Sequence, residues 1–205
     1  MKIVIIGIGA TAYSVADMLR ENRNFSIAGF VGNADEESRF NSGPLKKDYS
    51  FLGDRSVLPK LSYEGITGFV TAIGDNSARE KAFYEASEKG LVAINVISKQ
   101  AIVNNSCIMG KGIIISPGAN IGPGVIIDDN VVIESSVVID VNSMISSNVY
   151  IGPGAILCGE VQIRKNVSIG AGVIIEAGRE VGKNQMISAG SIIREDLEGL
   201  FGYQK

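Results

Sequence analysis

A large aliphatic residue stands at every sixth position from Ile97 to Ile193, with 17 matches in 17 positions. A helix repeats every 3.6 residues and a half-buried strand every two, so neither explains this pattern. A period of six is typical of a triangular parallel β-helix, in which one hexad forms each flat face and three hexads form a coil. The pattern predicts a left-handed parallel β-helix, and since no hexad is interrupted, we expect no long loop to leave it.

The third residue after each aliphatic is Gly or Asn in 12 of 16 hexads. These residue types tolerate a positive φ better than others, so the pattern predicts a corner with left-handed backbone in every hexad. The next residue is usually small or β-branched, and we expect it to fill the narrow interior. Arg179 and Gln185 depart from this rule.

The first part of the chain has a different pattern. A buried strand from Lys2 leads into a glycine turn, and the amphipathic stretch 12–21 follows it. Further strands are expected at 26–31, 66–73 and 91–95, with a helix at 77–89. Alternation of this kind predicts a small α/β domain with Rossmann-like βαβ units. We therefore expect two domains, at 1–95 and 96–205.

Composition narrows the class of protein. The chain has 205 residues, a formal net charge of −3 and 45% hydrophobic residues, which is typical of a globular domain and gives no indication of nucleic-acid binding. It contains no apolar run of membrane-spanning length and opens directly into a strand, so we expect a cytoplasmic protein without membrane insertion. Cys107 and Cys158 each lack a nearby Cys or His, and we expect packing roles and no metal site.

The glycine turn at residues 7–12 approximates G-x-G-x-x-A. Its glycines let the backbone approach a phosphate, and the following helix offers free N–H groups. Candidate ligand-binding residues here are Gly7, Gly9, Ala10 and Thr11. A dinucleotide fingerprint would place an acidic residue at the end of the second strand, and Asp35 comes a few residues late. Three alternatives stay open: a bound nucleotide moiety, which the pattern favours, a tight turn without ligand, and NAD.

Both halves together resemble a known family. The glycine turn, the segments 51–54 and 72–76 with Arg79, and the uninterrupted hexads resemble the PglD/NeuD-type sugar acyltransferases. The resemblance implies a homotrimer, acyl-CoA in the groove between neighbouring β-helices, and a nucleotide-linked amino sugar held by the N-terminal domain. It adds Asp75 and Asn76 to the candidate substrate-binding residues.

One departure from the family concerns catalysis. In the family, the coil corresponding to residues 138–143 carries a carboxylate followed by a catalytic His, and a second His lies nine residues later. This chain has Asp140, then Val141, then Tyr150, and it contains no His. Asp140, Asn142 and Tyr150 are the candidate catalytic residues. Each also has a structural interpretation: Asp140 as a corner cap, Asn142 as a turn residue and Tyr150 as a packing residue.

The missing imidazole has two explanations. A free amine attacks a thioester directly and becomes acidic only afterwards, so N-acylation needs no strong base, and positioning contributes up to about 7–11 kcal/mol. A subset of hexapeptide sugar N-acyltransferases, including those of anthrose-type pathways, is similar in lacking the base. We therefore expect an N-acyltransferase acting on a nucleotide-linked amino-deoxysugar. The alternatives are a sugar O-acetyltransferase and a non-catalytic ligand-binding paralogue.

For acyl-CoA the resemblance implies contacts from the later coils. The candidates are small residues, which also suit packing: Gly159, Ser168, Ala171, Ala177, Ala189 and Gly190, with Cys158 beside them. Basic residues of the same coils are candidates for the CoA phosphates: Arg164, Lys165, Arg179 and Lys183. The tail at 194–205 lacks the Gly-x-Pro ending of the family.

Overall fold

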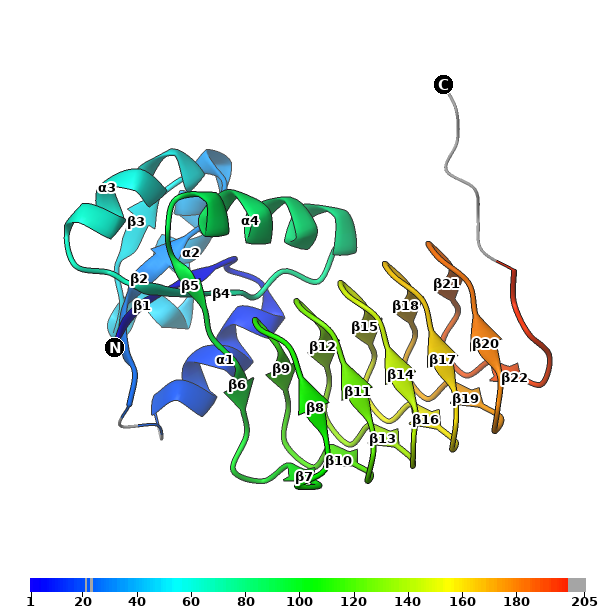
Figure 1. Cartoon of the computed structure of the whole chain (residues 1–205). Coiled ribbons are helices and arrows are strands. Elements are labelled where there is room, and N and C mark those ends of the chain that lie inside the picture. Colours follow the sequence, from blue (N-terminus) through cyan, green and yellow to red (C-terminus); the bar gives the residue numbers. More distant parts are fainter. Residues whose placement is uncertain (21, 23, 199–205) are drawn as a thin grey trace. The chain divides into compact units, whose positions relative to one another are not determined.

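A computed structural model describes residues 1–20, 22 and 24–198. The chain divides into two compact units, one up to Val96 and one from Ile97 onward, and we describe each by itself (Figure 1). Within the described residues, no helix combines the length and apolar character needed to cross a bilayer.

The first unit is built on a five-stranded parallel sheet with the strand order β3-β2-β1-β4-β5. Its strands are β1 (Lys2–Ile6), β2 (Ser26–Val31), β3 (Phe51–Gly53), β4 (Gly68–Thr71) and β5 (Val92–Ala93). Its helices are α1 (Ala10–Arg20), α2 (Glu37–Ser42), α3 (Leu58–Tyr63) and α4 (Asn76–Glu88), with short 3-10 turns η1 (Ala34–Glu36), η2 (Pro44–Lys47) and η3 (Arg55–Val57). The order reverses between β1 and β4, and in open α/β sheets ligands bind in the crevice beyond such a switch point.

The core of this unit explains its elements. Residues 3–6 of β1 are all buried, as expected for a central parallel strand covered on both faces. On one face, Leu58 and Leu61 of α3 join Ala82, Phe83 and Ala86 of α4 in a cluster with the β1 and β4 side chains. The expected strand at 26–31 is confirmed, and the expected helix at 77–89 is α4, one residue earlier at each end.

Other boundaries differ from the expectation. The helix expected at 12–21 begins at Ala10, and Glu21 lies outside the described residues. The strands expected at 66–73 and 91–95 are shorter, at 68–71 and 92–93. The elements between residues 34 and 63 were not predicted, because helices of six residues and a strand of three are too short to show a period.

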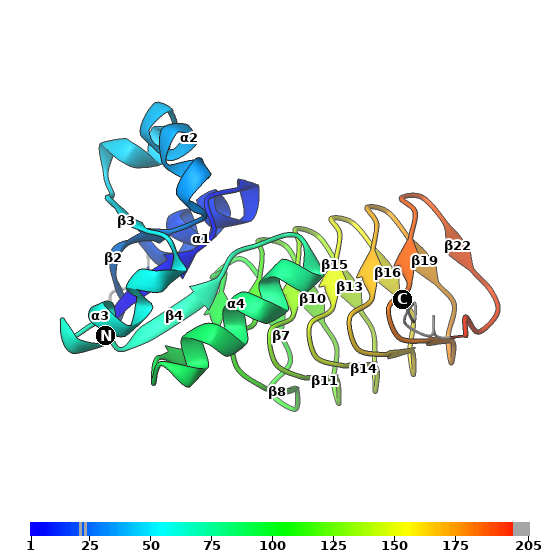
Figure 2. The same ribbon diagram turned by 90° about the horizontal axis from the view of Figure 1, so that it is seen from above.

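The second unit is the expected left-handed parallel β-helix, with two-residue strands in three parallel sheets. The first face holds β6 (Val96–Ile97), β9 (Ile114–Ile115), β12 (Val132–Ile133), β15 (Tyr150–Ile151), β18 (Ser168–Ile169) and β21 (Met186–Ile187). The second face holds β7 (Ile102–Val103), β10 (Asn120–Ile121), β13 (Val138–Ile139), β16 (Ile156–Leu157), β19 (Ile174–Ile175) and β22 (Ile192–Ile193). The third face holds β8 (Ile108–Met109), β11 (Ile126–Ile127), β14 (Met144–Ile145), β17 (Gln162–Ile163) and β20 (Glu180–Val181). Figure 2 shows the coils stacked in a regular row up to β22.

The corners confirm the predicted backbone. All 14 corner positions from Gly112 to Gly190 have a positive φ, including the Gly and Asn residues that the pattern singled out. Two other residues adopt it as well, Ser136 at φ 59° and Glu160 at φ 62°. The repeat therefore imposes the left-handed conformation even where the side chain does not favour it.

The interior is packed as the hexads predict. The aliphatic residues at the strand ends and the small residues just after the corners form one continuous buried cluster, which runs from Ile113 to Ile187. At the corner from the third to the first face, an asparagine ladder joins the coils. Asn130 donates to Asn148, Asn148 to Asn166 and Asn166 to Asn184, each amide contact measuring 2.8 Å.

Candidate functional site

The glycine turn after β1 uses its two glycines differently. Gly7 has φ 118°, its N–H donates to the Val31 carbonyl at 2.8 Å, and a methyl group placed on it would overlap the Ala72 carbonyl oxygen. Gly7 thus lets the ends of β1 and β4 approach each other. A Cβ on Gly9 would meet no atom within 4 Å, so this glycine faces open space.

A pocket of about 300 Å³ lies at this switch point. It is lined by Gly7, Ile8, Gly9, Ala10, Thr11, Asn33, Glu36, Arg55, Ala72, Ile73, Gly74 and Ala78. The carbonyl oxygen of Gly9 accepts from Ala12 and Tyr13, so α1 starts here and presents the positive end of its dipole. The structure brings together four predicted ligand-binding residues, Gly7, Gly9, Ala10 and Thr11. An anion is the ligand that such a pocket favours.

The acidic residue of this pocket is Glu36 and not the expected Asp35. Glu36 Oε2 accepts a hydrogen bond from the Asn33 N–H at 2.7 Å, whereas Asp35 is exposed and does not line the pocket. The reason is the 3-10 turn at 34–36, in which consecutive side chains point about 120° apart. The sequence signal was present, because Glu36 stands three residues after Asn33 as in a capping box.

Asp75 and Asn76 shape the neighbouring loop and do not line the pocket. Asp75 caps α4, since its Oδ1 accepts from the Ala78 N–H at 2.7 Å. Asn76 Oδ1 accepts from Arg79 Nη2 at 2.7 Å. Both predicted substrate-binding residues therefore hold the segment between β4 and α4.

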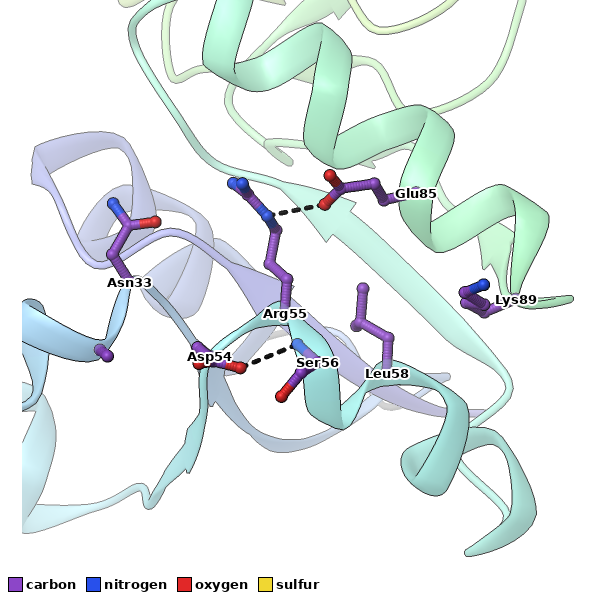
Figure 3. A pocket seen from close by; sticks show the side chains of 8 residues that line it. Asn33, Asp54, Arg55, Ser56, Leu58, Glu85 and Lys89 are labelled. Atoms are coloured by element: carbon purple, nitrogen blue, oxygen red, sulfur yellow. Dashed lines mark hydrogen bonds and ion pairs between the residues drawn. The ribbon is translucent and has the colours of Figure 1, made fainter.

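A second pocket of about 470 Å³ adjoins the first, because Asn33 and Arg55 line both. Figure 3 shows the side chain of Arg55, the first residue of η3, extending toward Glu85 of α4. Its Nε lies 2.7 Å from Glu85 Oε2. Lys89 also lines this pocket. Hydrogen bonds from Ser56 lower the pKa of Asp54, so this carboxylate is ionised. Sequence reasoning missed Arg55, although it stands two residues after a parallel strand and so lies at the ligand-binding edge.

The structure separates the candidate catalytic residues of the β-helix. Asp140 is exposed at the corner between the second and third faces, and its Oδ1 accepts from the Val141 N–H at 2.7 Å. Asn142, at φ 55°, is the positive-φ residue of the same corner. Tyr150 begins β15 on the first face, between Val132 and Ser168. In a triangular coil this face lies opposite that corner, so Tyr150 does not meet Asp140 within one chain.

The candidate acyl-CoA residues fall into two groups. Gly159 and Ala177 lie at the corner between the second and third faces, and a Cβ on Gly159 would be 3.7 Å from Asp140 Oδ2. The other group occupies the first face and its corner with the second face: Ser168, Ala171, Ala189 and Gly190. The two groups therefore flank the second face.

The second face itself exposes a row of aliphatic side chains. Ile102 is 67% exposed, and further along the row Val138, Ile156 and Ile192 are 36%, 39% and 45% exposed. Asn120 of β10 separates Ile102 from the others, and the apolar surface from Val138 to Ile192 is typical of an interface.

Of the basic residues expected near CoA, Arg179 contacts one of these groups, because its Nε donates to the Ala177 carbonyl at 3.4 Å. Arg164 Nε lies 2.6 Å from Glu180 Oε1, and this hydrogen bond raises the pKa of Arg164 and lowers that of Glu180. Arg179 Nη1 lies 3.4 Å from Asp196 Oδ1. Lys165 and Lys183 lie one coil apart at the corner opposite the second face. Part of the expected tail, 199–205, lies outside the described residues.

Metal ligands do not converge in the part of the chain that the structure describes, where no group of three or more His, Cys, Asp or Glu could hold an ion. Cys107 and Cys158 are free thiols, and burial raises the pKa of Cys107.

Comparison with protein families gives two matches. Residues 2–86 match the PglD N-terminal domain, and residues 142–177 match the bacterial transferase hexapeptide of six repeats. A comparison with curated proteins finds no match.

Solved structures extend the likeness over nearly the whole chain. PerB of Caulobacter crescentus, solved with CoA and GDP-perosamine, is 27% identical with a TM-score of 0.89, over 98% of this chain and 92% of that one. A variant of perosamine N-acetyltransferase from the same organism, with one histidine replaced by asparagine and the same two ligands, is 28% identical with a TM-score of 0.89, over 97% of this chain and 91% of that one.

The acetyltransferase domain of PglB from Neisseria gonorrhoeae, solved with acetyl coenzyme A, is 25% identical with a TM-score of 0.86, over 96% of this chain and 92% of that one. Two family matches in this order, with solved structures similar to both halves of the chain, fit the PglD/NeuD-type hexapeptide-repeat acyltransferases.

Proposed function

We propose that this protein transfers an acyl group from acyl-CoA to the amino group of a nucleotide-linked amino-deoxysugar. The observation that carries the proposal is the likeness, at TM-score 0.89 over 97% of the chain, to a perosamine N-acetyltransferase solved with CoA and GDP-perosamine. The two pockets of the α/β unit and the two residue groups beside the second face of the β-helix give each substrate a place.

The nucleotide part of the acceptor belongs in the α/β unit. The diphosphate takes the pocket at the α1 N-terminus, where Gly9 leaves open space and backbone N–H groups are available. The nucleoside extends into the adjoining pocket, which shares Asn33 and Arg55 with the first. Arg55 and Lys89 are the cations of this elongated site that a nucleoside diphosphate would meet, and Glu36, Asp54 and Glu85 are its carboxylates.

Acyl-CoA belongs to the β-helix in a homotrimer. The exposed aliphatic row of the second face requires a cover, and three-fold association would bury it. The two groups of candidate acyl-CoA residues lie on opposite edges of this face. Association would bring the edge with Asp140 and Gly159 of one protomer close to the edge with Ala171 and Ala189 of the next, and so complete a groove that no single chain forms.

The chemistry follows from the absence of histidine. The neutral amine attacks the thioester carbonyl carbon, the carbon–sulfur bond breaks, and the departing thiolate or water takes the proton from the new amide nitrogen. The protein contributes orientation and donors for the carbonyl oxygen. Where the resemblance places the base, this chain has Val141, and the carboxylate of Asp140 is held by the Val141 N–H at 2.7 Å.

The test is an assay of the purified protein with acetyl-CoA and a panel of GDP-, UDP- and dTDP-linked sugars, each offered with an amine and with a hydroxyl at the same carbon. Release of the CoA thiol and an amide in the product, identified by mass spectrometry and NMR, are the expected results. An ester product would make the protein an O-acetyltransferase. Binding of both substrates without turnover of any panel member would make it a non-catalytic paralogue.

A further inference from the structure

Arg79, in the first turn of α4, is completely buried, and its guanidinium donates hydrogen bonds to one short segment. Nη1 donates to the carbonyl oxygens of Ile73 at 3.1 Å and Gly74 at 3.2 Å, and Nη2 donates to Asn76 Oδ1 at 2.7 Å. All three acceptors belong to residues 73–76, which connect β4 to α4. Arg79 therefore fixes the path of this segment.

The segment is one wall of the switch-point pocket. Ala72, Ile73 and Gly74 line the pocket together with the glycine turn at 7–11. The two walls meet where Gly7 packs against the Ala72 carbonyl with no room for a side chain. A small shift of residues 73–76 would therefore change the width of the pocket.

Peptide geometry gives the guanidinium a second effect. In a trans peptide the C=O and N–H bonds point in opposite directions, and the described part of the chain has no cis peptide. Because the Ile73 carbonyl points to Arg79, the Gly74 N–H points away from it. The Gly74 carbonyl also points to Arg79, so the Asp75 N–H likewise points away from it. Two backbone donors are thus turned away from the buried guanidinium.

We propose that Arg79 is a positioning residue for substrate binding, which aims the N–H group of Gly74 at the diphosphate of the nucleotide sugar. The inference rests on the proposed function, because it concerns the same pocket. The diphosphate is then held between two walls, the α1 N-terminus on one side and residues 73–76 on the other. Charge-assisted hydrogen bonds to carbonyls are strong enough to keep such a wall in place.

The test separates this role from a purely structural one. Arg79→Lys keeps the positive charge but replaces the two separate donor nitrogens, Nη1 and Nη2, by one. Asn76→Ala removes one acceptor while placing a good helix former in the first turn of α4. Lys60→Gln is the control, since it removes a positive charge from a 76% exposed side chain of α3 that lines neither pocket. Calorimetry with GDP, UDP and dTDP gives Kd, and steady-state kinetics give KM for the nucleotide sugar and for acetyl-CoA.

We expect Arg79→Lys to raise the nucleoside diphosphate Kd and the nucleotide-sugar KM by about 10- to 100-fold, with a smaller rise for Asn76→Ala and none for Lys60→Gln. The KM for acetyl-CoA should stay within about twofold. Unchanged diphosphate affinity in Arg79→Lys, or equal losses for both substrates, would overturn the inference. If Arg79→Lys does not fold, Asn76→Ala decides by the same criteria. Failure of the wild-type protein to bind any diphosphate would instead remove the proposed nucleotide site.

Discussion

The carboxylate of Asp140 accepts a hydrogen bond from the backbone nitrogen of Val141, the next residue, at 2.7 Å. In the family this carboxylate is followed by an imidazole, whereas here a hydrocarbon side chain follows it and lies near Gly159. The carboxylate has become part of a local turn. Its contribution to the reaction is therefore expected to be small.

Asp140→Asn and Tyr150→Phe should each leave measurable turnover. Asparagine keeps an oxygen that can accept from the Val141 N–H, and a lost orienting contact costs about 1–3 kcal/mol, or up to roughly a hundredfold in kcat/KM. The profile of kcat/KM should rise with pH toward the pKa of the acceptor amine and then level off. Complete loss of turnover in a folded Asp140→Asn protein with normal substrate binding would require a general base.

Val141→His tests the same mechanism by adding the imidazole that this chain lacks. It restores an imidazole beside Asp140, and if a base limited the rate, kcat/KM would rise and follow the imidazole pKa near 6.5. We expect no such rise, because the free amine is already a nucleophile. Stopped-time assays between pH 5.5 and 9 measure both profiles.

Gly9→Asp should raise KM for the nucleotide sugar much more than KM for acyl-CoA. The added carboxylate would repel a diphosphate at the α1 N-terminus, while its Cβ meets no protein atom within 4 Å, so the fold is preserved. Separate saturation curves for the two substrates measure this difference.

Gly7→Ala is the contrasting variant for that experiment. At φ 118°, with the Ala72 carbonyl in the way of a methyl group, it should lower the unfolding temperature and weaken every activity together. Equal KM increases for both substrates in a folded Gly9→Asp variant would mean that the glycine turn does not bind the nucleotide sugar.

Ile156→Lys should dissociate the proposed trimer. Ile156 lies in the aliphatic row of the second face with 39% of its surface exposed, and a charge there would be buried by association. Met186→Lys, on the first face and 82% exposed, is the matched control and should remain trimeric. Light scattering at micromolar concentration distinguishes the two, and a monomeric wild-type protein would remove the proposed groove.

The ion pair between Arg164 and Glu180 gives a pH-dependent contribution to stability. The hydrogen bond from Arg164 lowers the pKa of Glu180 below its ordinary value of 4.5, so the folded state favours the carboxylate. This stabilisation is present above pH 4.5 and is lost as the pH falls through the lowered pKa. At pH 7 the wild type should have a higher melting temperature than Glu180→Gln. The difference should be small, because the pair is exposed to solvent. The difference should shrink below pH 4.5. A constant difference down to pH 3 would contradict this account.

The β-helix could be predicted because its period is long and unbroken. Each hexad has the same two requirements, an aliphatic residue inside and a positive φ at the corner. Even Ser136 and Glu160 therefore adopt a positive φ. The segment 34–63 has no such redundancy, and its short elements are fixed by tertiary packing such as that of Phe40 against Phe30 and Phe51.

The candidate sites were harder to predict than the fold. The glycine turn is a local motif, and its residues lie together as expected. The sequence pointed to Asp35, whereas Glu36 lines the pocket, because one residue of 3-10 turn decides which side chain faces it. Asp140 and Tyr150 were grouped by the resemblance to the family, and in one chain they lie at a corner and on the face opposite it.

The strand pairing also limits how the chain length can change. Every pair in the β-helix joins residues one coil apart, as Val138 pairs with Ile156, and the asparagine ladder repeats the same spacing of 18 residues. Loss or gain of six residues would keep the hydrophobic period but rotate every later side chain to a different face. Natural variants of this protein should therefore lengthen or shorten the β-helix in whole coils, and a one-coil deletion is the smallest internal truncation expected to fold with its remaining edges in line.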